Sequence, residues 1–109
     1  MLSEVELKQL ETYFGFLRKS KSLFVGRNLE MKLKKNEISY LILFPSSCSS
    51  RSKENLYQIL SSNVVVLEYT GEIKVHELLN QKEIKALGIK EPHLGKKVYD
   101  LLSKDIQVK

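Results

Sequence analysis

Apolar residues at the start of the chain recur with the spacing of an amphipathic helix. The residues on its predicted inner face are Val5, Leu7, Leu10, Phe14 and Leu17. Ser3 and Glu6 precede most of this pattern in the arrangement of a capping box, in which each side chain bonds the backbone of the other residue. Arg18, Lys19 and Lys21 follow at the far end, where cations complement the helix dipole. The pattern therefore predicts a first helix that begins at the capping box.

Four later segments have the composition of strands. Residues 39–44 form a continuous apolar run, which is typical of a buried central strand. Residues 64–69 are rich in β-branched side chains, which favour strands. Two shorter segments, 22–25 and 86–89, are expected to add two more strands to the same sheet.

Helical patterns separate these strands. We expect Asn28 to cap a second helix that runs to about Asn36, and we expect further helices over roughly 51–60 and 75–81. Pro92 is well placed to open a last helix that continues to about Ser103. The predicted inward positions are Leu29, Leu33, Leu56, Ile59, Leu60, Leu78, Leu79, Leu94, Val98, Leu101 and Leu102. This alternation predicts an α/β fold, with helices on both faces of a mixed, largely parallel sheet of about four strands.

Length and composition agree with one globular domain over residues 1–109. The hydrophobic fraction of 42% can supply a core, and no apolar run approaches the ~20 residues that span a bilayer. The acidic N-terminus lacks the charged and apolar regions of a secretory signal. A single cysteine, Cys48, excludes an internal disulfide. We therefore expect a cytoplasmic protein that is not inserted in a membrane.

Positive charge is concentrated in one part of the chain. The formal net charge is +5, yet residues 18–35 alone hold seven basic residues against one acidic residue, Glu30. The basic residues are Arg18, Lys19, Lys21, Arg27, Lys32, Lys34 and Lys35. Such a cluster suggests an anionic partner, and the alternative is a solvated lysine-rich face. A membrane surface is not favoured, because Gly26 and Asn28 interrupt any long amphipathic helix.

The residues that carry chemistry give weak support to an enzyme or a metal site. His76 and His93 fall in different predicted elements without cysteines or paired carboxylates at ligand spacing, so we expect neither a metal nor another cofactor. Cys48 lies in a loop after a central strand, where α/β folds place reactive groups, and Arg51 and Lys53 follow it. The loop has no second cysteine and no glycine. We interpret Cys48 as an incidental thiol, and a small enzyme that uses it is the catalytic alternative.

The segment from Gly26 to Lys32 favours recognition of an anion. A glycine before a helix lets the backbone approach a ligand, and the helix N-terminus offers N–H groups to anions. Asn28 adds an amide that both donates and accepts, and Lys32 lies one turn further on the same face. The combination suits a phosphate backbone with exposed base edges. The alternative is a plain helix cap with an exposed lysine.

Three stretches together resemble a known family. They are residues 21–32 with Gly26, Asn28 and Lys32, then an apolar strand and a loop with two serines over 40–53, and then 64–91. In order and spacing they resemble the ribosomal L-seven-Ae and L-thirty-e superfamily, whose members bind kink-turn and related RNA folds. The chain is most similar to the small bacterial members, and the resemblance runs from the first helix to Leu102.

This resemblance implies a three-layer α/β/α sandwich that binds structured RNA, such as a kink-turn or a related ribosomal RNA element, as a ribosomal or ribosome-associated protein. Gly26 would permit close approach, Asn28 would bond base edges at sheared G·A pairs, and Lys32 would reach the same bases or a phosphate. General electrostatics adds phosphate contacts from neighbouring cations. The residues predicted to contact RNA are Gly26, Arg27, Asn28, Lys32, Lys34, Lys35, Ser49, Arg51, Thr70, Gly71 and Ile73.

The sequence departs from the family pattern at several positions. Leu29 stands where many members have glutamate, Ser47 lies near an acidic position, and Leu79 replaces a common glycine. In relatives, the loop corresponding to residues 69–74 packs on a flipped-out nucleotide. These departures bear on kink-turn specificity more than on the fold. They motivate a second hypothesis, a protein-interaction or regulatory domain of the same fold that does not bind RNA.

Overall fold

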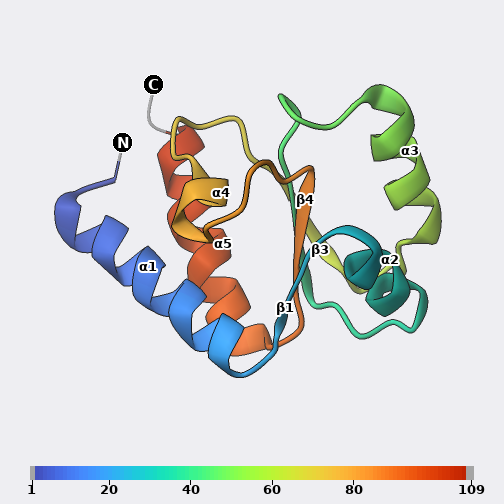
Figure 1. The fold of residues 1–109 in the computed structure, drawn as a ribbon, viewed down its shortest axis with the longest axis horizontal. Coiled ribbons are helices and arrows are strands. Elements are labelled where there is room, and N and C mark those ends of the chain that lie inside the picture. Colours follow the sequence, from blue (N-terminus) through green and yellow to red (C-terminus); the bar gives the residue numbers. More distant parts are fainter. Residues whose placement is uncertain (1, 108–109) are drawn as a thin grey trace.

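Five helices and four strands alternate along residues 2–107, which are the residues that the computed structural model describes (Figure 1). The helices are α1 (Glu4–Lys19), α2 (Gly26–Lys34), α3 (Ser50–Ile59), α4 (Val75–Leu78) and α5 (Pro92–Gln107). The strands are β1 (Leu23–Phe24), β2 (Tyr40–Leu43), β3 (Val65–Glu68) and β4 (Ala86–Ile89). The order of helices and strands is the order that the apolar pattern predicts.

The four strands form one mixed sheet with the order β1-β4-β2-β3. β2 and β3 are parallel, with Tyr40 opposite Val65. β4 is antiparallel to both of its neighbours, with Ile42 of β2 opposite Leu87 and Leu23 of β1 opposite Ile89. Three strands therefore run in one direction and β4 runs against them, which confirms the predicted mixed four-stranded sheet. The sheet is not largely parallel in its pairings as predicted, because β4 inserts between β1 and β2 and makes two of the three pairings antiparallel.

Helices cover both faces of the sheet, and this confirms the three-layer arrangement. α1, α4 and α5 lie on one face, whereas α2 and α3 lie on the other (Figure 1). The buried core under the first group contains Leu10, Phe14, Leu17, Ile42, Leu67, Val75, Leu87, Ile89, Val98 and Leu102, with further residues at its margin. The core under the second group contains Leu29, Leu33, Ile38, Leu41, Leu43, Leu56 and Ala86.

The capping box of α1 forms as the sequence predicts. The Ser3 hydroxyl accepts a hydrogen bond from the Glu6 backbone N–H at 3.2 Å, and the Glu6 carboxylate accepts one from the Ser3 N–H at 3.0 Å. Glu6 also pairs with Lys104 near the end of α5. The hydrogen bond from Lys104, together with that from the Ser3 backbone, lowers the pKa of Glu6 to about 2. These contacts connect the first turn of α1 to the last turns of α5.

Two predictions about helix residues were wrong. Val5 was expected on the inner face of α1, but its exposed fraction is 66%. The reason is that Val5 is two residues before Leu7, about 200° around the helix from the face that packs. Asn28 was expected to cap α2, but the N-cap residue is Val25 and Asn28 lies inside the first turn. The chain turns already at Gly26, whose φ of +61° is left-handed, and the Leu29 N–H then donates to the Val25 carbonyl.

Helices α1, α2 and α4 end in the same kind of turn. In each case a residue with a left-handed backbone follows the last helical residues, at Lys21 (φ +57°), Asn36 (φ +58°) and Asn80 (φ +55°). The paired hydrogen bonds of a Schellman motif close each turn, for example from the Ser22 N–H to the Leu17 carbonyl at 2.8 Å. The turn at Asn80 ends α4 before the predicted limit near 81. The turn at Asn36 likewise ends α2 slightly before its predicted limit.

Candidate functional site

The first turn of α2 is exposed. Gly26, Arg27 and Asn28, which together are called the α2 tip below, are all solvent-exposed. Val25 provides no side-chain cap, and the first turn contains no acidic residue. Since the first N–H groups of a helix lack partners within the helix, the α2 tip presents backbone donors beside a cationic side chain and an amide side chain.

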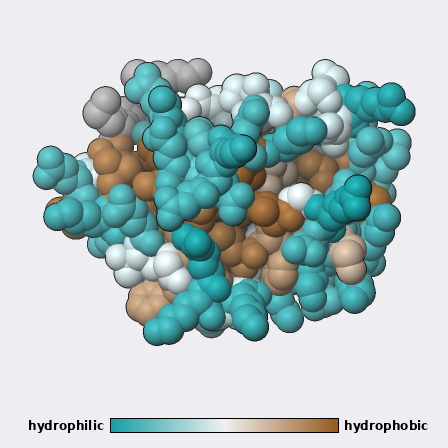
Figure 2. Space-filling view, viewed as in Figure 1, coloured by the Kyte–Doolittle hydropathy of each residue, from teal (hydrophilic) through white to brown (hydrophobic). Residues whose placement is uncertain are grey.

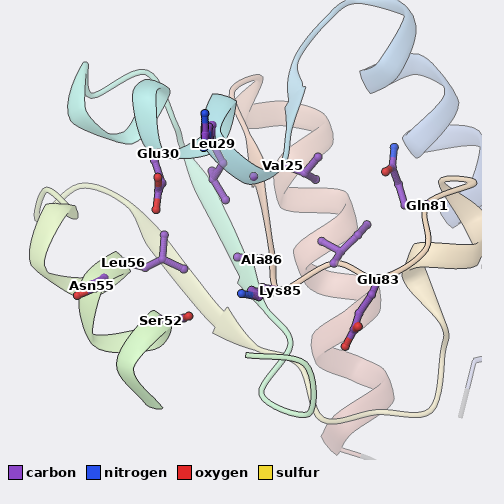
Figure 3. Close-up of a pocket in the computed structure, with 13 residues that line it drawn as sticks. Val25, Leu29, Glu30, Ser52, Asn55, Leu56, Gln81, Glu83, Lys85 and Ala86 are labelled. Atoms are coloured by element: carbon purple, nitrogen blue, oxygen red, sulfur yellow. The ribbon is translucent and has the colours of Figure 1, made fainter. Parts of the chain in front are cut away.

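A cavity of about 450 Å³ lies beside the α2 tip and is called the central cavity (Figure 3). It is bounded by α2, by α3 and by residues 81–86, which lead into β4. The apolar side chains that line it are Val25, Leu29, Leu56, Ile84 and Ala86. The polar residues that line it are Arg27, Glu30, Ser52, Asn55, Gln81, Glu83 and Lys85. The side chains of Leu29 and Leu56 reach toward the same space from opposite helices.

The central cavity combines an apolar interior with a charged margin of both signs. Arg27 and Lys85 contribute two cations, and Glu30 and Glu83 contribute two carboxylates. Figure 2 shows apolar surface near the centre of this face, framed by hydrophilic side chains. Such a site suits a flat, partly apolar group with hydrogen-bonding edges better than a bare ion.

A second hollow, of about 390 Å³, lies next to the central cavity and is called the loop hollow. The loops after β2 and β3 form most of it, and the residues involved include Ser46, Ser47, Thr70, Gly71, Ile73 and His76. Ile84 lines both spaces. The loops predicted to flank the site, 46–52 and 69–74, therefore meet at one edge of the sheet and adjoin the α2 tip through residues 81–86.

Tyr69 fixes the shape of the loop after β3. Its hydroxyl donates to the Asp105 carboxylate of α5 at 2.6 Å and accepts from the Ile73 N–H at 2.9 Å. Burial, together with the hydrogen bond to Asp105, raises the pKa of Tyr69 well above its ordinary value. A Cβ atom on Gly71 would overlap both the Tyr69 hydroxyl and the Asp105 carboxylate. The loop is therefore held close to α5, and Gly71 permits this close approach.

The predicted residues of α3 lie at its first turn. The Ser49 hydroxyl caps the helix by accepting from the Ser52 N–H at 3.1 Å. Arg51 is exposed one residue before Ser52, which lines the central cavity. Neither predicted residue lines the central cavity or the loop hollow: Ser49 caps α3, and Arg51 is an exposed cation beside Ser52.

The structure separates the predicted lysines of α2 from its tip. Lys32 contacts the Glu37 carboxylate at 3.4 Å and lies over the Phe24 ring, 5.3 Å from its centre. Lys34 and Lys35 are exposed at the other end of the helix, roughly 12 Å along its axis from the α2 tip. Residues that are neighbours in the sequence are thus divided between two ends of one helix.

Residues 81–86 were absent from the sequence-based site, although they form one wall of the central cavity. The sequence carries a faint signal for them: Ile84 is an isolated apolar residue between the charged residues Glu83 and Lys85. Ile84 is buried, and its charged neighbours are exposed. Sequence reasoning missed the segment because α4 and the turn at Asn80 bring it to the α2 tip from more than 50 positions away.

The structure also shows the residues that the sequence offers for other chemistry. Among residues 2–107, no group of three potential metal ligands lies close enough to hold an ion. Cys48 is a partly buried free thiol. In the same part of the chain, no helix is both long and apolar enough to cross a bilayer.

Comparison with known proteins identifies a relative in fold. The sequence matches no protein-family model and no curated protein. A solved structure of a Bacillus halodurans protein of unknown function is similar to this chain, with a TM-score of 0.68 and 16% sequence identity. The match covers 86% of this chain and 96% of that chain. At this identity the likeness establishes a shared fold alone.

Proposed function

We propose that this protein binds structured RNA through the face formed by the α2 tip, the central cavity and the loop hollow. The observation that carries the proposal is the exposed, uncapped α2 tip, with Arg27 and Asn28 beside a cavity of mixed polarity. The proposal is supported by Ile84, which lines both the central cavity beside this tip and the loop hollow, whose loops the family resemblance associates with RNA. The resemblance also suggests the class of RNA, a kink-turn or a related ribosomal element.

Each part of this face suits a different part of an RNA. The N–H groups of the α2 tip and the Arg27 guanidinium suit a phosphate. The Asn28 amide suits a base edge, since it can donate and accept at once. The apolar floor of the central cavity suits the face of an unpaired base, and its polar margin suits the edges of that base. Proteins read RNA mostly at such unpaired positions, because the deep groove of A-form RNA excludes side chains.

The phosphate contacts in this proposal differ from those expected from the sequence alone. Lys34 and Lys35 lie at the far end of α2, and Lys32 is engaged with Glu37 and Phe24. Arg27 is exposed and lines the central cavity, and Arg51 is an exposed cation beside Ser52, which lines the same cavity. We therefore assign the main electrostatic contribution to these two arginines. The three lysines of α2 are expected to act only at long range.

Binding of a kink-turn hairpin tests the proposal, with a fully paired hairpin of equal length as the control. We expect the kink-turn RNA to bind at least about tenfold more tightly than the paired hairpin, and we expect its affinity to fall steeply as salt is raised. Equal affinity for the two RNAs would contradict kink-turn recognition. Failure to bind either RNA would contradict RNA binding altogether and would favour the protein-interaction hypothesis.

A further inference from the structure

A third hollow is lined by Asn28 of the α2 tip, shares Val25 and Gln81 with the central cavity, and is called the basic hollow. Its volume is about 300 Å³. The polar residues that line it are Arg18, Lys21, Asn28 and Gln81, and the apolar ones are Leu23, Phe24, Val25 and Leu79. All four polar side chains carry N–H donors. Of the residues that the structure describes, no aspartate or glutamate lines this hollow.

The backbone of Lys21 gives a second, independent reason to single out this hollow. Lys21 occupies the left-handed position of the Schellman motif after α1, with a φ of +57°. Glycine is usual at such positions because a Cβ atom is disfavoured there, and asparagine is the next choice. The equivalent turns after α2 and α4 have Asn36 and Asn80. A lysine in this left-handed conformation raises the free energy of the folded state locally. Residues strained in this way are common at functional sites.

The turn holds Lys21 firmly in place. Its N–H donates to the Arg18 carbonyl at 3.1 Å, and the next N–H, that of Ser22, donates to the Leu17 carbonyl at 2.8 Å. Ser22 is buried, and its hydroxyl lies 3.1 Å from that of Ser20. The backbone of Lys21 is therefore held at a fixed point at the end of α1, and Arg18 lines the same hollow.

We propose that the basic hollow binds a phosphate group of the RNA, with Arg18 and Lys21 as its cations and Asn28 and Gln81 as neutral donors. This inference rests on the proposed RNA-binding function and extends its face beyond the α2 tip. Four donors without a neighbouring carboxylate match an anion with several acceptor oxygens. The location fits a continuous strand, because Gln81 lines both this hollow and the central cavity. If a base of the RNA occupied the central cavity, the sugar–phosphate backbone of that RNA would pass the α2 tip and reach Lys21.

The substitution Lys21→Gly separates folding from binding. Glycine relieves the left-handed strain, so the variant should melt at the same temperature as the wild type or above it. It also removes one cation, so its affinity for the kink-turn hairpin should fall by about fivefold. The slope of log affinity against log salt should become shallower by about one. A merely structural role for Lys21 would move neither the affinity nor the slope.

Lys19→Ala is the matched control. Lys19 carries the same charge two residues away, is exposed, and does not line the basic hollow. We expect Lys19→Ala to change the affinity by less than about twofold. Equal losses for the two variants would overturn the subsite and leave a diffuse electrostatic field as the explanation. Unchanged binding by Lys21→Gly would also overturn it, while the proposed function would stand. Failure of the wild type to bind the hairpin would overturn the proposed function and this subsite with it.

Discussion

An Arg27→Glu variant is expected to bind the kink-turn hairpin on the order of 100-fold more weakly than the wild type at low salt. The substitution removes a cation from the α2 tip and places a carboxylate where we propose that a phosphate binds. The fold should not suffer, because a negative side chain in the first turn of a helix interacts favourably with the helix dipole. The first turn of α2 has no acidic residue of its own. Repulsion from Glu30, three positions later on the helix, should cost only about 0.2–0.5 kcal/mol. The measurement is a titration of labelled hairpin, with a thermal melt of each protein.

Lys34→Glu is the control for this prediction. It makes the same change in net charge on the same helix, but at the end remote from the α2 tip. We expect a loss of only a few fold, because solvent and salt screen charges at that separation. If the two variants lost affinity equally, binding would depend on overall charge, and the assignment of the site to the α2 tip would be wrong.

Phe14→Ala should lower the free energy of unfolding by about 3–5 kcal/mol, the largest effect on stability that we expect from a single substitution. Phe14 is 1% exposed and belongs to the core between α1, α5 and the sheet. Its removal deletes a large apolar side chain and leaves a cavity that close-packed neighbours fill only in part. Small domains are stable by about 5–15 kcal/mol, so this loss is a large share of the total. Denaturant unfolding followed by circular dichroism measures it.

Phe16→Ala is the matched control for packing. Phe16 lies in the same helix two residues later, and its exposed fraction is 56%. We expect its substitution to change the free energy of unfolding by less than about 1 kcal/mol. Similar losses for the two phenylalanines would mean that α1 presents a different face to the sheet from the one described here.

Local patterns predicted the elements well where one physical rule dominated. The capping box at Ser3 placed the start of α1, and residues 86–89 were predicted as a strand with the bounds that the structure has. Rules failed where two of them competed. Asn28 has the preference of a cap, but Gly26 turns the chain two residues earlier and Val25 becomes the N-cap residue. Val5 is apolar like the inward residues of α1, but it lies on the other side of the helix and is exposed.

The candidate site was harder to predict than the fold, because it depends on contacts between distant segments. The basic run over 18–35 reads as one patch in the sequence. In the structure it is divided among the end of α1, the α2 tip and the far end of α2. Residues 81–86 meet the α2 tip only because β4 inserts between β1 and β2. No local pattern encodes that strand order, since it results from the packing of the whole chain.

The shift of backbone amide resonances on addition of the kink-turn hairpin tests the central claim most directly. The account predicts that the largest shifts fall on Gly26, Arg27 and Asn28, and on residues 81–86, with smaller ones over 70–73. Shifts confined to the outer surfaces of α1 and α5, with the α2 tip unchanged, would contradict it.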